Sequence, residues 1–120
     1  KTGRWIAFFG ENLDAKIDMI EKQEISNLSF QCNLTKGDWI FNAKSVKVLG
    51  SNDGGNYEEI HYQEFPIETI AEDGVLSYSV DFEKTSVRYV NIIIEPHMCP
   101  EGHSGYGYPA WIFVDELKIN

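Results

Sequence analysis

The sequence predicts an all-β domain, an antiparallel β-sandwich of the jelly-roll type. Apolar and polar residues alternate over many short segments, which is the pattern of strands with one buried face. Turn-forming pairs that contain glycine and aspartate separate these segments. Strands that follow one another without intervening helices form antiparallel sheets, so we expect two such sheets packed face to face.

The predicted strands fall into two kinds. Half-buried strands, in which apolar and polar side chains alternate, are expected at residues 15–19, 28–32, 46–48 and 76–82. Central strands, apolar on both faces and rich in β-branched side chains, are expected at residues 87–94 and 111–119. The last two segments should therefore form the core of the domain.

The segments between these strands carry the chemistry of tight turns. Gly37-Asp38, Asp53-Gly54-Gly55 and Asp73-Gly74 supply residues that tolerate a positive φ or hydrogen-bond to the local backbone. Residues 19–28 have helical spacing but fit a strand equally well, so we expect very little helix.

Length and composition indicate one domain that spans residues 1–120. A chain of 120 residues with 42% hydrophobic side chains buries roughly two-thirds of its unfolded surface and folds alone. Because the chain starts on Lys1 without a methionine, we expect it to be a module truncated at its N-terminus and excised from a longer protein.

Charge and hydropathy exclude two classes of partner. Nineteen acidic residues against ten basic residues give a net charge of -9, which repels nucleic-acid phosphates, so we expect no nucleic-acid partner. Nothing in the sequence approaches the 18 or more consecutive apolar residues of a membrane helix, so we expect no membrane insertion.

Two cysteines, Cys32 and Cys99, match neither a zinc site nor a CxxC redox motif. Both lie at the ends of predicted strands. They form a disulfide if those ends meet in the fold, and they are two half-buried free thiols if the ends do not meet. The sequence favours neither alternative.

The loop CPEGHSGYGYPA, residues 99–110, is the best candidate for a functional surface. Tyr106 and Tyr108 alternate with glycines, which keep the backbone low and leave the two rings free to stand up as platforms. Glu101 and His103 could direct hydrogen bonds from the same loop. Alternatively, the glycines and prolines only shape the loop, and the tyrosines and His103 pack back on the sandwich.

The tryptophans have competing interpretations. Trp39 follows the turn at residues 37–38 and extends the aromatic surface if that turn lies beside the final loop; otherwise it belongs to the core. Trp5 and Trp111 are predicted to be core or near-core residues, Trp111 the more strongly because it opens the most apolar strand.

Ionisable residues do not assemble a catalytic centre in the sequence. The three histidines lack the spacing of a transition-metal site. We expect His61 to be an exposed loop residue, whereas His97 is undecided. Asp115 and Glu116 are adjacent on a strand, so they point to opposite faces and cannot both act on one bond. Without a paired nucleophile and base, we expect the isolated domain not to be an enzyme.

Four segments resemble, in the same order, a known family. They are LDAKIDM (residues 13–19), DWIF (38–41), SNDGGNYEEI (51–60) and SVRYVNIII (86–94). Together they resemble the discoidin, or coagulation factor type C, domains, a galactose-binding-like β-sandwich family that includes the family 32 carbohydrate-binding modules. The ending GHSGYGYPAWIFVDEL (102–117), with WIAFFG (5–10), is similar to the C-terminal module of bacterial family 20 glycoside hydrolases, the β-N-acetylhexosaminidases or chitobiases, especially those of gut Bacteroidetes.

The resemblance implies a non-catalytic accessory module of a secreted glycoside hydrolase. Its partners would be glycans of the N-acetylhexosamine or galactose type and the parent catalytic domain, in the periplasm, at the cell surface or outside the cell. Tyr106, Tyr108, His103, Glu101 and Trp39 are the residues expected to contact the sugar. In the alternative interpretation, the domain is a structural module that packs on the catalytic domain and binds no sugar.

The resemblance also raises the question of calcium. No cofactor is required, but a glutamate at the position of Glu116 commonly helps to bind a structural calcium in discoidin-like modules. The family's upstream calcium loop would precede Trp5, where only KTGR stands. Calcium needs six or more oxygen ligands, so the alternative is a Glu116 that is solvated or hydrogen-bonded.

Overall fold

The structure, a computed structural model, describes residues 6–9, 11–69 and 72–120. Its elements are the strands β1 (Ile6–Phe9), β2 (Leu13–Leu34), β3 (Ala43–Ser51), β4 (Glu58–Glu64), β5 (Gly74–Pro96) and β6 (Trp111–Ile119), and the short 3₁₀ helix η1 (Lys36–Asp38). The hydrogen-bonded strand order is β1-β6-β2-β5-β3-β4, and every strand pair is antiparallel.

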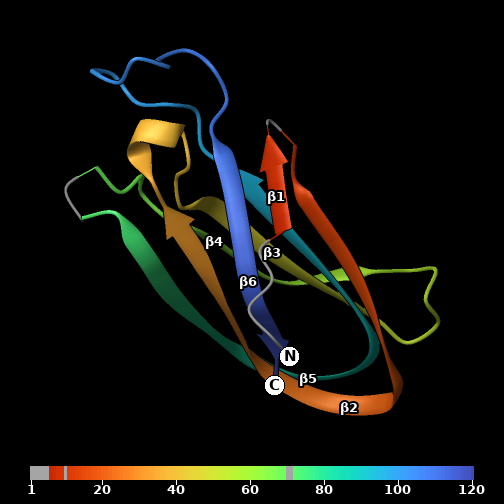
Figure 1. The fold of residues 1–120 in the computed structure, drawn as a ribbon. Coiled ribbons are helices and arrows are strands. Elements are labelled where there is room, and N and C mark those ends of the chain that lie inside the picture. The colour runs from red at the N-terminus through yellow and green to blue at the C-terminus, as the bar shows by residue number, and fades with distance from the viewer. Residues whose placement is uncertain (1–5, 10, 70–71) are drawn as a thin grey trace.

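Strands β2 and β5 are long and bend together (Figure 1). They pair from Leu13↔Ile94 to Leu34↔Gly74, with register shifts between Asp18 and Gln23 and between Ile25 and Asn27. These irregularities lie at the bend, as expected for bulges that bend a strand and increase its twist. Each strand therefore contributes one half to each layer of the fold.

Two layers result from this bend. One contains β4, β3, the second half of β5 and the first half of β2; the other contains the first half of β5, the second half of β2, β6 and β1. The antiparallel β-sandwich predicted from the sequence is confirmed. The strand count differs, because the segments expected as separate strands at 15–19 and 28–32 belong to β2, and those at 76–82 and 87–94 belong to β5.

The main core lies between the layers and follows the alternation of the sequence. Leu28, Phe30 and Cys32 of β2 are buried, whereas Ser29 and Gln31 between them are only half-buried. A second, smaller cluster closes one end of the sandwich; it consists of Leu34, Phe41, Cys99 and Ala110. This second cluster supports the loop that joins β5 to β6.

Other sequence expectations have mixed outcomes. The expectation of little helix agrees with η1, the short 3₁₀ helix within the described residues. Trp111 is 38% exposed, so its prediction as a core residue is wrong: Ile112 and Val114 take the inward positions of β6, and the alternation turns Trp111 outward. Trp5 lies outside the described residues.

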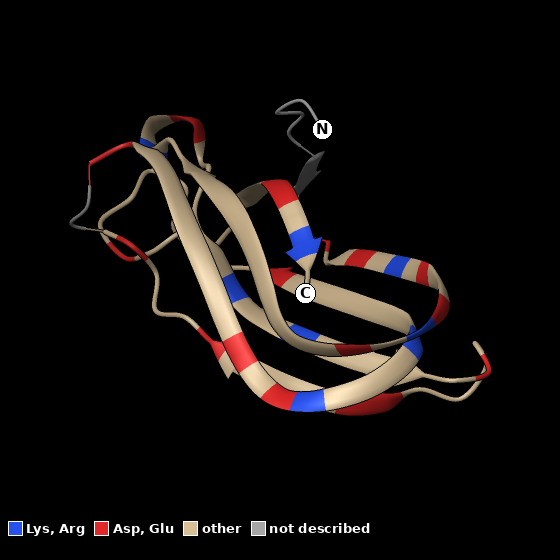
Figure 2. Cartoon of the chain, turned by 90° about the horizontal axis from the view of Figure 1, so that it is seen from below, with Lys and Arg blue, Asp and Glu red and all other residues tan. Residues whose placement is uncertain are grey.

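The charged residues are spread over many elements rather than gathered on one face (Figure 2). The edge strand β4 carries Glu58, Glu59 and Glu64, and charged side chains on an edge oppose pairing with another chain. His61 lies on this strand and is half-buried, so the expectation that it is an exposed loop residue is wrong. The helical part of the described chain lacks the length and apolar character that crossing a membrane requires.

We expect both cysteines to react as thiols only after unfolding. Both are free and buried, Cys32 in the main core and Cys99 in the smaller cluster. Burial raises the pKa of Cys32 to about 12 and also raises the pKa of Cys99, so little thiolate forms at pH 8. Ellman's reagent should therefore react slowly with native protein and detect both thiols in denaturant. Fewer than two thiols in the denatured, unreduced chain would contradict the free state.

Candidate functional site

The loop of residues 97–110 covers one end of the sandwich beside η1 (Figure 1). Its two ends are tied together, because the Cys99 amide donates to the Tyr108 carbonyl at 2.9 Å and the Ala110 amide donates to the His97 carbonyl at 3.0 Å. Inside the loop, the Tyr106 and Tyr108 amides each donate to a carbonyl further back in the loop, at 3.0 and 2.9 Å. The loop is therefore a closed, internally hydrogen-bonded structure.

His103 fastens this loop to the preceding helix. Its Nδ1 accepts a hydrogen bond from the Gly105 amide at 2.9 Å, so Nε2 carries the proton and donates to the Lys36 carbonyl at 2.6 Å. The ring also packs against Phe41 and Trp39, with centroid distances of 5.3 and 6.1 Å. Because both ring nitrogens serve the backbone, the geometry favours a positioning role for His103 over direct contact with a ligand.

Trp39 is held in an uncommon backbone conformation next to this contact. Its φ is 64°, in the left-handed region that bulky residues rarely adopt. The Trp39 amide donates to the Lys36 carbonyl at 3.1 Å, and the Trp39 carbonyl accepts from the Trp111 amide at 2.7 Å. A backbone in this region is strained and persists only where its surroundings hold it in place. These two hydrogen bonds hold the Trp39 backbone.

The Trp39 and Tyr108 rings lie together at this end of the sandwich. Their centroids are 6.0 Å apart and their planes are tilted by 32°. Tyr108 is 62% exposed, whereas Trp39 is half-buried, so Trp39 both packs on the smaller cluster and reaches the surface. We call these two rings the aromatic platform; Tyr108 contributes most of its exposed surface.

The remaining predicted site residues lie on the same loop but farther from this contact. Tyr106 is 60% exposed and Glu101 is also exposed. The structure therefore brings Trp39, His103 and Tyr108 into contact and leaves Tyr106 and Glu101 free to approach a ligand. Their roles in binding stay predictions.

Glu116 and Asp115 occupy an irregular stretch of β6. Asp115 is buried, and Glu116 has a φ of 53° and lies 3.9 Å from the Lys118 ammonium, measured between Oε2 and Nζ. Within residues 6–9, 11–69 and 72–120, no three or more His, Cys, Asp or Glu side chains are grouped so that they could hold a metal ion. The calcium role of Glu116 stays a prediction.

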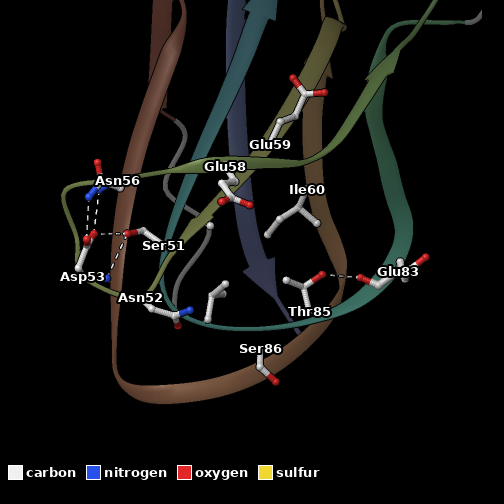
Figure 3. Close-up of a pocket in the computed structure, with 12 residues that line it drawn as sticks. Ser51, Asn52, Asp53, Asn56, Glu58, Glu59, Ile60, Glu83, Thr85 and Ser86 are labelled. Carbon is white, nitrogen blue, oxygen red and sulfur yellow. Dashed lines mark hydrogen bonds between the residues drawn. The ribbon is translucent and has the colours of Figure 1, made fainter.

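Sequence reasoning missed a hollow of about 560 Å³ next to the turn after β3 (Figure 3). In that turn, Asp53 accepts hydrogen bonds from the Asn56 and Gly55 amides, the Asn56 side chain and the Ser51 hydroxyl. These bonds, that of the Asn56 amide first, hold the pKa of Asp53 well below its usual range. The Asp53-Gly54-Gly55 motif predicted the turn. The sequence did not predict the hollow, because the acidic residues that line it come from segments that are separate in the chain.

No protein-family model matches this sequence, and no curated protein matches it significantly. Solved structures do match. CBM32-3 from a family 31 glycoside hydrolase of Clostridium perfringens superimposes with a TM-score of 0.52 at 12% identity, over 94% of this chain and 72% of that one. CpGH89CBM32-5, also from C. perfringens and in complex with GalNAc-β-1,3-galactose, has a TM-score of 0.50 at 18% identity, over 87% and 67%.

The chain has the fold of the family 32 carbohydrate-binding modules. The resemblance seen in the sequence is thus confirmed at the level of the fold. The C-terminal domain of a chitobiase from Bacteroides fragilis also matches, with 24% identity and a TM-score of 0.47. That match covers 92% of this chain and 66% of the chitobiase domain, so the chain spans less than two-thirds of that domain's length.

We expect Gly105→Ala to destabilise the module. An added methyl group would lie 2.9 Å from the Trp39 ring and 3.0 Å from the Cys99 sulfur, so the indole or the loop must move. Overpacking of this kind costs about 1–3 kcal/mol, which urea unfolding can measure. Gly37→Ala is the matched control, because nothing lies within 4 Å of its added methyl. Equal losses in the two variants would argue against tight packing at Gly105.

We also expect the module to lose stability between pH 7 and pH 5 through His97. Burial lowers the pKa of His97, and its Nε2 is buried without a hydrogen-bond partner among the described residues. The unfolded chain takes up the proton below about pH 6.5 and the folded chain resists it, so the free energy of unfolding falls as the pH drops. His97→Gln should flatten this dependence and His61→Gln should not; an unchanged slope in His97→Gln would refute the assignment.

Proposed function

We propose that the chain is a non-catalytic carbohydrate-binding module that targets its parent enzyme to glycans through the loop of residues 97–110. The observation that carries this proposal is the aromatic platform, in which the exposed Tyr108 ring lies beside the half-buried Trp39 ring, on a loop that is hydrogen-bonded within itself and to η1. A fixed loop loses little conformational freedom when a ligand binds, which favours affinity.

The proposed mechanism of binding is stacking with directed hydrogen bonds. The C–H face of a pyranose packs on the Trp39 and Tyr108 rings, and the exposed Tyr106 closes on the ligand from the same loop. The exposed Glu101 carboxylate accepts hydrogen bonds from sugar hydroxyls. His103 holds the platform in place through the Lys36 carbonyl and does not itself contact the sugar.

The proposed ligands are glycans that end in N-acetylhexosamine or galactose-type sugars, and the proposed parent is a secreted β-N-acetylhexosaminidase or chitobiase. The shared fold of CpGH89CBM32-5, solved with GalNAc-β-1,3-galactose, supports the choice of sugars to test. The origin of CBM32-3 in a family 31 glycoside hydrolase supports an accessory role. Such an enzyme would act in the periplasm, at the cell surface or outside the cell.

A second candidate function is that of a structural module docked on the catalytic domain. The exposure of Met98, Tyr106, Tyr108 and Trp111, all within or next to the loop, favours it. Clustered exposed apolar side chains are also typical of protein interfaces. The two functions differ in what the same loop contacts.

We expect Tyr108→Ala to weaken glycan binding by roughly tenfold or more, because the exposed half of the stacking surface is lost. Tyr106→Ala should have a smaller effect. Binding to N-acetylgalactosamine, galactose and chitooligosaccharides is measured on a glycan array and by calorimetric titration. Tyr62→Ala, which removes an exposed tyrosine from β4, is the control. It should bind glycans with the same affinity as the unsubstituted chain.

Two results would contradict the proposal. One is the absence of binding to every glycan tested, together with loss of interdomain stability in Tyr108→Ala of the parent enzyme, which supports the structural module. The other is equal weakening in Tyr108→Ala and Tyr62→Ala, which places the sugar away from the loop.

A further inference from the structure

Three segments of the chain meet at the end of the sandwich that carries the aromatic platform. They are η1, which follows β2, the loop of residues 97–110, which follows β5, and the residues that precede β5 (Figure 1). The pair Leu34↔Gly74 joins the end of β2 to the start of β5, so Asp73 lies beside the start of η1. The contacts of Asp73 therefore bear on how the platform is held.

Helix η1 is not capped by its own N-cap residue. Lys36 is its first residue, and the first amides of a helix need acceptors outside the helix. Thr35, at the N-cap position, makes no side-chain cap hydrogen bond; its hydroxyl donates instead to the Asn33 side-chain oxygen at 2.6 Å. A helix of three residues depends on such external contacts, because a single turn orders several backbone dihedrals in exchange for few hydrogen bonds.

Asp73 supplies this cap from a distant part of the sequence. Its Oδ1 atom accepts a hydrogen bond from the Lys36 amide at 3.2 Å and lies 3.5 Å from the Lys36 ammonium. The Asp73 side chain is 51% exposed, and an ion pair between exposed groups contributes little to stability. The hydrogen bond to the amide is therefore the contact that matters, because it fixes the backbone of Lys36.

The carbonyl of the same residue holds the platform. It accepts hydrogen bonds from the Trp39 amide at 3.1 Å and from the His103 Nε2 atom at 2.6 Å. A carbonyl oxygen has two lone pairs, and these two donors use both of them. Trp39 is one ring of the platform, and the His103 ring packs against it with a centroid distance of 6.1 Å. The position of the Lys36 backbone thus determines where Trp39 and His103 lie.

Tight packing transmits this position to the rest of the loop. The His103 Nδ1 atom accepts from the Gly105 amide at 2.9 Å, and a methyl group at Gly105 would lie only 2.9 Å from the Trp39 ring. The Tyr108 amide in turn donates to the Gly105 carbonyl at 2.9 Å. A close-packed contact has no gap that could absorb a displacement, so a shift of the Lys36 carbonyl must move the platform rings.

We propose that Asp73 is a positioning residue for ligand binding at the aromatic platform. It fixes the Lys36 amide, and the Lys36 carbonyl then fixes His103 and Trp39. These two residues hold Tyr108 in place for the ligand, which Asp73 itself does not touch. The proposal rests on the proposed function of the loop, but the contacts through which Asp73 acts can be measured without a ligand.

The test compares Asp73→Ala with Asp73→Asn in the complete chain of 120 residues. Alanine removes the acceptor, whereas asparagine keeps an acceptor oxygen and removes only the charge. Asp73→Asn is measured freshly purified, and its intact mass checks that the new amide beside Gly74 has not hydrolysed. The first readout is NMR of the His103 ring nitrogens, which reports the tautomer and the solvent exchange of the Nε2 proton. We expect this proton to exchange faster in Asp73→Ala and to be unchanged in Asp73→Asn.

The second readout is calorimetric titration with N-acetylgalactosamine, galactose and chitooligosaccharides. We expect Asp73→Ala to weaken binding roughly threefold to tenfold, as for the loss of one hydrogen bond, and Asp73→Asn to bind as the unsubstituted chain does. In a His103→Ala background, Asp73→Ala should cause a clearly smaller loss, because the two residues act along one series of contacts. An equal loss in both backgrounds would overturn the proposal.

Asp81→Ala is the matched control. Asp81 is also an aspartate that accepts a hydrogen bond, from the Asn27 side chain at 2.8 Å, but it lies near the bend of β5 and away from η1. It should leave both readouts unchanged, and a loss equal to that in Asp73→Ala would overturn the proposal. Unchanged exchange of the His103 proton in Asp73→Ala would also overturn it. If the unsubstituted chain binds none of these glycans, the proposed function is wrong, and the His103 signal alone decides whether Asp73 positions the platform.

Discussion

The pairing of β2 with β5 is the interaction on which the rest of the structure depends. It runs from Leu13↔Ile94 to Leu34↔Gly74 and resumes after each register shift at the bend, where both strands continue. Because the two strands bend together, one pair of strands belongs to both layers. The second half of β5 then supports β3 and β4, and the second half of β2 supports β6 and β1. The layers cannot slide past each other without breaking this pairing.

The same bend explains why the candidate site forms where it does. Both β2 and β5 return to the end from which they started, so Leu34 and Pro96 lie at the same end of the sandwich in different layers. Helix η1 follows Leu34, and the loop of residues 97–110 follows Pro96. The hydrogen bond from His103 to the Lys36 carbonyl closes the gap between these two connections. The aromatic platform is thus a product of topology as much as of loop sequence.

The sequence could predict features that depend on local periodicity. The alternation of apolar and polar residues identified Leu28, Phe30 and Val80 as inward residues. Turn chemistry identified Asp53-Gly54 as a turn, because side chains of the turn itself accept the hydrogen bonds that form it. The bends were hidden, because residues 19–26 contain neither glycine nor proline, and Ile20 takes a φ of 72° with no local signal. The Trp39 conformation and the role of His103 were hidden for another reason. Trp39 is held by the Trp111 amide and His103 by the Lys36 carbonyl, and both partners are distant in the chain. Trp111 was misassigned because hydrophobicity was given more weight than the period of its strand.

The two ends of the sandwich are held by separate sets of contacts, and this separation has a physical consequence. At one end, the ring of His103 and the strained backbone of Trp39 fix a largely uncharged aromatic surface. At the other, hydrogen bonds to Asp53 fix the turn beside a carboxylate-lined surface. Between them lie the buried β-branched side chains Val46, Val48, Val90 and Ile92, which belong to a close-packed apolar interior. Substitutions at the two ends share no partner, so their effects on stability should add. The fold can therefore vary the chemistry of either end while the paired β2 and β5 strands keep the other unchanged.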